Sequence, residues 1–143
     1  MSIDGNSPET IRDILTGTRR IALVGASNKT HRASHEVMGF LLACGFEVTP
    51  VNPMLAGKEI HGRVVQASLD GAAPLEMVDL FRASARVGPS VDDAIRLGAR
   101  VVWMQLGVVD EAAARRARAA GLTVVMDRCP VIEFARLGLS PRA

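Results

Sequence analysis

The most constraining feature of this sequence is a run of four apolar residues, Ile21-Ala22-Leu23-Val24, that ends abruptly at Gly25. A strand that is apolar on both faces is typical of a parallel sheet covered by helices on both sides. Further strand-like runs lie at residues 46–51, 77–81, 101–104 and 122–126. Helical segments alternate with these runs. The sequence therefore predicts an α/β fold, a three-layer, doubly wound parallel sheet of about five strands.

Capping residues predict where the intervening helices begin and end. The candidate caps are Ser7 with Pro8 for a helix over 8–16, Ser34 for a helix closed by Gly45, Ser90 with Asp93 for a helix over 91–97, and Asp110 for a helix through Ala120. The segment 57–69 is predicted as a loop with one short edge strand at most. No internal repeat interrupts this alternation.

Composition limits the classes of protein to which the chain can belong. Its 143 residues, 48% of them hydrophobic, fit a single domain over 1–143, with flexible ends at 1–7 and 137–143. The formal net charge is only +2, the basic residues are scattered along the chain, and aromatic residues are few. These features argue against a nucleic-acid partner. No apolar run approaches the roughly 20 residues of a membrane-spanning helix. Cys44 and Cys129 form no C-x-x-C pair and no secretory signal is visible, so we expect a soluble, reduced, cytoplasmic protein without a membrane partner.

The position of a ligand follows from the predicted sheet. Ligands of open parallel sheets bind outside the carboxyl ends of the strands. The loops at that edge are residues 25–34, 52–58, 81–90, 105–109 and 127–130. The first of them, Gly25-Ala26-Ser27-Asn28-Lys29-Thr30-His31-Arg32, supplies backbone N–H groups, hydroxyls and cations between a strand and a helix. This chemistry suits a phosphate or pyrophosphate.

Two departures argue against a standard NAD site. The pattern Gly25-x-Ser27-x-x-Thr30 lacks the later glycines of G-x-G-x-x-G, and Asn52-Pro53 follows the second strand where an acidic group would hold the ribose. There is also no G-x-x-x-x-G-K-[ST] phosphate loop. The predicted pocket suits an anionic ligand without matching the usual sites for NAD or ATP.

Several single residues allow a functional and a structural interpretation. Lys29 and Arg32 could bind phosphate or be solvated surface charges, and Ser27 could contact the ligand or bond its own turn. His31 and His35 lack an obvious third metal ligand, so no metal site is predicted. The other open cases are Cys129, favoured as a small buried residue over a reactive thiol, Trp103, favoured as core, and Gln105, which could meet a ligand amide or tie down its loop. No base and orienting partner stand at a recognisable spacing, so no catalytic residue is predicted.

Taken together, the loops resemble a known family. The matching motifs, spread from Ile11 to Glu133, are Gly25-Ala26-Ser27, Ser34-His35, Val51-Asn52-Pro53, Gly57-Lys58, Val78-Asp79-Leu80-Phe81-Arg82, Trp103-Met104-Gln105-Leu106-Gly107 and Asp127-Arg128-Cys129. They resemble the small stand-alone CoA-binding-domain proteins of bacteria, whose fold is similar to the CoA-binding domain of the succinyl-CoA synthetase alpha subunit. The resemblance implies a Rossmann-like fold with strand order 3-2-1-4-5 and coenzyme A as the ligand.

The resemblance also implies roles for particular loops. The CoA phosphates would be contacted by the Gly25-Ala26-Ser27 motif, through Gly25 and Ser27, and by the two cations that follow it, Lys29 and Arg32. The adenine and ribose phosphate would lie beside Val51, Asn52, Pro53 and Lys58. The pantetheine arm would run along Phe81, Arg82, Gln105 and Leu106. The phosphorylated histidine that synthetases carry on a second domain has no counterpart in this chain.

We therefore expect a protein that binds coenzyme A or an acyl-CoA as a non-catalytic carrier, sensor or regulator. The alternatives are an NAD(P)-dependent oxidoreductase, and a CoA-ligase or CoA-transferase subunit that needs a partner chain. A homo-oligomer is also compatible with the sequence.

Overall fold

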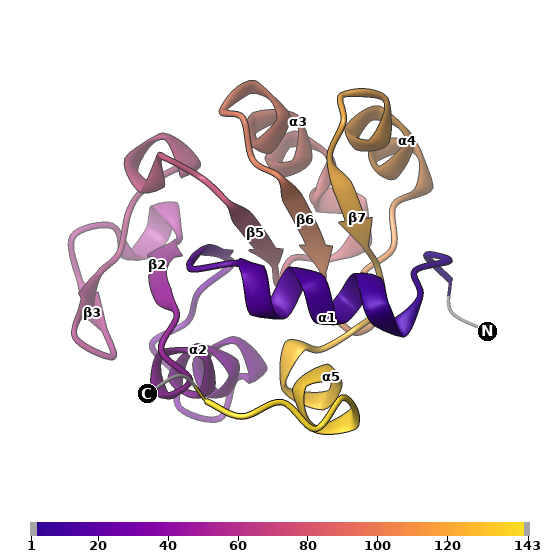
Figure 1. Cartoon of the computed structure of the whole chain (residues 1–143). Helices are drawn as coiled ribbons and strands as arrows, with labels where there is room; N and C mark the ends of the chain where they lie inside the picture. The colour runs from indigo at the N-terminus through magenta and orange to yellow at the C-terminus, as the bar shows by residue number, and fades with distance from the viewer. Residues whose placement is uncertain (1–2, 142–143) are drawn as a thin grey trace.

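The apolar runs form the strands of one parallel sheet in the computed structural model, which describes residues 3–141. The strand order is β2-β1-β5-β6-β7 (Figure 1). The bounds are Arg20–Val24 for β1, Glu47–Val51 for β2, Met77–Leu80 for β5, Val101–Met104 for β6 and Thr123–Val125 for β7. The predicted α/β class and parallel sheet are confirmed.

Helices cover both faces of this sheet. Their bounds are Pro8–Gly17 for α1, Ala33–Ala43 for α2, Gly88–Arg96 for α3, Glu111–Ala119 for α4 and Pro130–Arg136 for α5. Helices α3 and α4 lie on one side of the sheet, and α2 and α5 lie on the other (Figure 1). Each strand divides its side chains between two cores, so that Ala22 and Val24 pack toward α3 and α4, while Ile21 and Leu23 pack toward α1, α2 and α5. Burial on both faces explains why β1 is continuously apolar.

Two of the four predicted helix caps are confirmed. The Ser7 hydroxyl accepts a hydrogen bond from Thr10 N at 3.1 Å, and the Asp110 carboxylate accepts one from Ala113 N at 3.0 Å. The predictions for Ser34 and Ser90 were wrong because both residues lie inside their helices, which begin earlier. No side chain caps α2 or α3, and the first-turn proline of α3 starts that helix instead.

The segment after β2 forms a hairpin rather than a strand of the main sheet. Strands β3 (Glu59–Ile60) and β4 (Arg63–Val64) pair with each other in antiparallel fashion. The chain then touches β2 through a single parallel bridge between Val51 and Gln66. Numbered along the chain, the five strands of the main sheet stand in the order 2-1-3-4-5, which differs from the order 3-2-1-4-5 that the resemblance implies. The hairpin meets β2 through one bridge and adds no strand of the main sheet beside it within residues 3–141. Short 3-10 helices lie at Pro53–Leu55, Leu69–Ala72 and Ser84–Arg86.

Helix α5 is an element that the sequence pattern does not predict. Pro130 occupies its first turn, and Phe134 packs edge-on against Phe40 of α2 and against Phe46, with ring centroids 5.6 Å and 6.3 Å apart. Trp103 is buried in the same core, as predicted, and its indole nitrogen donates to Arg128 O at 2.8 Å. Helix α5 therefore completes the layer that α2 begins.

The start of the described chain is anchored to β7 and α5. Asp4 is buried and accepts hydrogen bonds from the Arg128 guanidinium at 2.9 and 3.0 Å. The flexible ends predicted for 1–7 and 137–143 lie partly outside the described residues, which exclude 1–2 and 142–143. Among residues 3–141, no helix is both long enough and apolar enough to cross a membrane.

Candidate functional site

The turn after β1 is built on a glycine that no other residue could replace without a shift. Gly25 has a φ of +86°, and a Cβ atom there would lie 2.9 Å from Phe81 O. The turn is held by Gly25 N, which donates to Val51 O at 3.0 Å, and Phe81 N, which donates to Val24 O at 2.9 Å. Three strand ends thus meet at Gly25, at the carboxyl edge of β1, β2 and β5.

A cavity of about 410 Å³ lies over this turn, and we call it the loop cavity. Its lining consists of Gly25, Ala26, Ser27, Asn28, Lys29, Arg32, Ala33, Ser34, Asn52, Met54, Leu55 and Phe81. Helix α2 begins in this lining without a side-chain cap, and Ser27 N and Asn28 N donate no hydrogen bond within residues 3–141. Free backbone N–H groups and the positive end of a helix dipole favour an anion at this position.

Asn52 fixes the wall of the loop cavity that faces β2. Its side-chain nitrogen donates to Ala26 O at 2.8 Å, and its side-chain oxygen accepts from Met54 N at 2.9 Å. Both polar ends of Asn52 are therefore used to hold the loops together. This arrangement explains physically why an amide stands where an NAD site would carry an acidic residue.

Basic side chains approach the same turn from two sides. Lys29 and Arg32 line the loop cavity, whereas Arg82 and Arg86 line a second cavity that also contains Gly25, and that we call the arginine cavity. The arginine cavity shares Asn52, Met54 and Phe81 with the loop cavity. Within the described chain, none of the four cations takes part in an ion pair. Four uncompensated positive charges therefore surround one turn.

A third cavity, also of about 410 Å³, lies between α2 and α5, and we call it the apolar cavity. Its lining consists of Ala33, Glu36, Val37, Phe40, Phe81, Gln105, Leu106, Val108, Cys129, Val131 and Ile132. It shares Ala33 and Phe81 with the loop cavity, so the two hollows adjoin along the carboxyl edge.

Two buried polar side chains, Asp79 on β5 and Gln105 just after β6, have oxygen atoms without a hydrogen-bond partner within residues 3–141. Both carboxylate oxygens of Asp79 and Oε1 of Gln105 form no hydrogen bond within residues 3–141. Asp79 is fully buried at the same register as Leu23 and Trp103, and this burial raises the pKa of its carboxyl well above the ordinary value. Gln105 lies farther along the edge, in the lining of the apolar cavity.

The structure brings most of the predicted site residues to the three cavities. Those that line them are Gly25, Ala26, Ser27, Lys29, Arg32, Asn52, Phe81, Arg82, Gln105 and Leu106. Val51, Pro53 and Lys58 line none of these three cavities. Val51 is buried beneath the turn and accepts from Gly25 N, so its contribution is structural.

Sequence reasoning missed several lining residues. Met54 directly follows the predicted Pro53, and Arg86 lies four residues after the predicted Arg82. Val37 and Phe40 are residues of α2 that form a wall of the apolar cavity. Val131 and Ile132 were missed because α5 was not anticipated, although Pro130 is a recognisable helix-start signal.

Cys129 and the histidines have definite surroundings. Cys129 is buried and also lines the apolar cavity. His35 stacks on His61 with ring centroids 4.1 Å apart, and His61 Nε2 lies 2.9 Å from His35 O. No group of three or more metal-ligating side chains occurs in the part of the chain that the structure describes.

Comparison with known proteins adds to this geometry. The family model described as a CoA binding domain matches residues 19–135. YneT of Bacillus subtilis is 32% identical over 129 residues, which cover 90% of this chain and 95% of YneT. A hypothetical protein from Pyrococcus horikoshii is 43% identical, with a TM-score of 0.91 over 96% of both chains. A Thermus thermophilus protein is 32% identical, with a TM-score of 0.87 over 92% of this chain and 99% of that one.

Proposed function

Because the chain belongs to the CoA-binding domain family, we propose that it binds coenzyme A or a CoA thioester at the carboxyl edge of its sheet. The loop cavity would take phosphate groups of the ligand. The observation that carries this proposal is the uncapped start of α2, which faces the loop cavity beside the Gly25 turn.

The charges around the turn suit the charges of coenzyme A, which carries a diphosphate and a separate phosphate on its ribose. Lys29 and Arg32 lie on one side of Gly25, and Arg82 and Arg86 lie on the other. One pair can neutralise the diphosphate while the other approaches the ribose phosphate. A ligand with two separated anionic groups therefore uses both cavities.

A binding role without catalysis agrees with the residues at the edge. Cys129 lines the apolar cavity together with Glu36, and no histidine lines the loop, arginine or apolar cavity in the described part of the chain. Nucleophilic catalysis requires an activating base within hydrogen-bond reach. We therefore propose a carrier, sensor or regulator that responds to CoA.

Isothermal titration calorimetry with CoA, NAD, NADP and ATP tests the proposal. We expect CoA to bind more tightly than the other three nucleotides. The double substitution Lys29→Ala with Arg32→Ala should weaken CoA binding by about 10- to 100-fold, because two charge-assisted contacts are lost. It should also reduce the dependence of affinity on salt.

The matched control is Arg63→Ala with Arg115→Ala, which removes the same charge from two exposed positions outside the three cavities. This control should leave the affinity for CoA within about twofold of wild type, as expected for remote, screened charges. Tight NAD binding without measurable CoA binding would overturn the proposed function.

A further inference from the structure

We propose that the apolar cavity holds the acyl group of an uncharged, aliphatic CoA thioester. This inference rests on the proposed binding of CoA and names the class of thioester that the site takes. The loop and apolar cavities share Ala33 and Phe81, so a ligand anchored by its phosphates can extend past these residues into the second hollow. The far end of CoA is the sulfur that carries the acyl group.

The walls of the apolar cavity suit a hydrocarbon chain. Helix α2 contributes Val37 and Phe40, and α5 contributes Val131 and Ile132. Two apolar residues of the lining are exposed to solvent, Ile132 by 44% and Leu106 by 52%. Exposed apolar side chains around a concave apolar surface are typical of a site that a ligand covers.

Gln105 supplies a polar contact at the correct place for such a ligand. It is 6% exposed and lines the apolar cavity, yet its Oε1 accepts no hydrogen bond within residues 3–141. A buried polar atom without a partner is destabilising. Because Oε1 is itself shielded from solvent, the Gln105 amide has to turn toward the cavity before a ligand donor can reach it. The last amide N–H of the pantetheine arm is such a donor, and only two methylene groups separate it from the sulfur. Once the amide has turned, a hydrogen bond to Gln105 would place the thioester inside the apolar cavity, which Gln105 lines.

Charge distinguishes between classes of acyl group. Glu36 is the one charged side chain in the described lining of the apolar cavity, and no cation lines it. A carboxylate on the acyl group, as in a succinyl or malonyl thioester, would meet Glu36 and find no positive partner. The cavity therefore favours a neutral acyl chain over a dicarboxylic one.

The volume of the cavity limits the length of the chain. About 410 Å³ is near the lower end for ligand sites and must also hold the terminal part of the pantetheine arm. A short or medium-length acyl group fits this space, whereas most of a long fatty acyl chain would remain in water.

The first experiment is a calorimetric series with CoA and its acetyl, butyryl, hexanoyl, palmitoyl and succinyl thioesters. Affinity should rise about three- to fourfold for each methylene that enters the cavity, and then level off before palmitoyl. Succinyl-CoA should bind more weakly than butyryl-CoA by at least about tenfold because of the buried carboxylate. These measurements use the wild-type protein and do not depend on any variant folding.

The second experiment fills the cavity. Val131→Trp should remove the advantage of hexanoyl-CoA over CoA and leave CoA affinity within about twofold, since the indole occupies the space of the acyl chain. Val64→Trp is the matched control, because Val64 is 51% exposed on the hairpin and lines none of the three cavities. The control should retain the wild-type preference.

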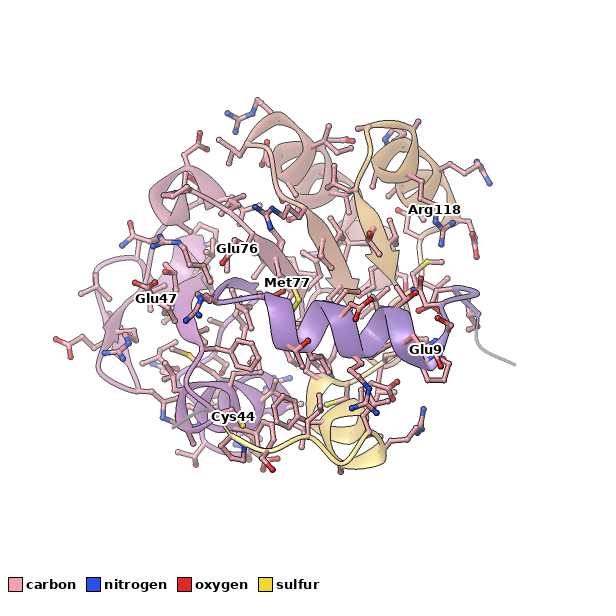
Figure 2. All side chains as sticks on the ribbon, in the orientation of Figure 1. Glu9, Cys44, Glu47, Glu76, Met77 and Arg118 are labelled. Atoms are coloured by element: carbon pink, nitrogen blue, oxygen red, sulfur yellow. The ribbon has the colours of Figure 1, made fainter. Side chains whose placement is uncertain are left out.

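A third readout uses the cysteines. Hexanoyl-CoA should slow alkylation of Cys129, which lines the apolar cavity, whereas adenosine 3′,5′-bisphosphate, which lacks the pantetheine arm, should not. Cys44 directly follows the last residue of α2 (Figure 2). It is buried and does not line the apolar cavity, so it is the internal control. Peptide mass spectrometry separates the two thiols.

The outcomes separate this inference from the proposed function. If CoA binds but affinity does not rise from acetyl to hexanoyl, or if succinyl-CoA binds as well as butyryl-CoA, the acyl cavity is wrong while CoA binding stands. If neither CoA nor any thioester binds, the proposed function itself is wrong. A rising series that Val131→Trp abolishes supports both.

Discussion

Gly25 shows how one residue can position a whole site. Its positive φ lets the chain leave β1 sharply, and its missing side chain lets Phe81 O approach the backbone. Those two demands are separable because Gly57 has nearly the same φ, +85°, but open space where its Cβ would lie. The pair therefore distinguishes backbone strain from steric exclusion.

We expect Gly25→Ala to lower the free energy of unfolding by about 2–4 kcal/mol, through backbone strain and the clash with Phe81 O together. Gly57→Ala introduces the backbone strain without a clash, so it should lower the free energy of unfolding by only about 1 kcal/mol. Urea denaturation of both variants measures the difference. Equal losses of stability would show that the close approach of Phe81 is unimportant.

Asp79 is a second residue whose environment makes a definite prediction. It is a carboxyl group buried in the central strand without a hydrogen-bond partner within residues 3–141, and burial raises its pKa. The folded protein therefore keeps the proton at a pH at which the unfolded chain has lost it. Its contribution to stability is complete below about pH 4, the unfolded pKa, and is lost as pH rises toward the raised folded pKa.

Asp79→Asn, which cannot ionise, should remove this dependence. Between about pH 4 and the raised pKa, wild type should lose roughly 1.4 kcal/mol of stability per pH unit relative to Asp79→Asn. Urea denaturation at several pH values from 4.5 to 7.5 gives the two curves. Parallel curves for wild type and variant would mean that Asp79 has an ordinary pKa in the folded protein.

At the scale of elements, the sequence predicted the strands better than the helix starts. Continuous apolar runs identify β1 and β6 directly because burial on both faces leaves no polar position. Ser34 and Ser90 were mistaken for caps because a serine near a helix start is compatible with several starting positions. Helix α5 was missed since its seven residues are too short for a clear helical period, and packing against α2 stabilises it.

The junction of the amino-terminal segment with β7 and α5 rests on a buried charge cluster. Burial alone would raise the pKa of Asp4, but hydrogen bonds from Arg128, Met126 N and Asn6 N lower it to about 2. Arg128 also donates to Glu133 at 2.7 Å, so one guanidinium joins the segment to α5. This contribution is present above about pH 4 and is lost as pH falls through about 2.

Asp4→Asn should therefore destabilise the protein by about 2–3 kcal/mol at neutral pH, because a buried guanidinium loses a charged partner. Asp13→Asn is the control, as Asp13 is an exposed residue of α1. Thermal denaturation at pH 7 and at pH 2.5 measures both variants. The difference between wild type and Asp4→Asn should shrink at the lower pH, and a constant difference would contradict the role assigned to the Asp4 charge.

At the scale of the whole molecule, the polar groups at the two edges of the sheet differ in how far they are paired. Glu47 and Glu76 lie at the amino edge (Figure 2). Glu76 accepts from Arg20 N at 2.8 Å, and the Arg20 side chain reaches Glu47 at 3.2 Å, so these polar groups satisfy one another. At the carboxyl edge, N–H groups, cations and an amide oxygen remain without partners among residues 3–141. The sequence could predict at which edge the loops that line these cavities gather, because parallel topology brings the carboxyl ends of the strands together. It could not predict the apolar cavity, which arises where α2 and α5 meet across strand ends far apart in the chain.

This asymmetry makes a prediction about the whole molecule on ligand binding. CoA should slow amide hydrogen exchange in residues 25–34, 81–86 and 105–109, relative to the protein without ligand. In these loops the ligand would both contact the backbone and suppress local opening. Exchange in residues 17–20, 74–76, 98–100 and 120–122, which precede the strands, should change much less, although binding stabilises the global fold. With CoA at 100 times its Kd, linkage gives about 2.7 kcal/mol of added global stability, so slowly exchanging core amides should slow by roughly 100-fold. Protection concentrated at the amino edge would place the ligand elsewhere and refute the assignment of the carboxyl edge.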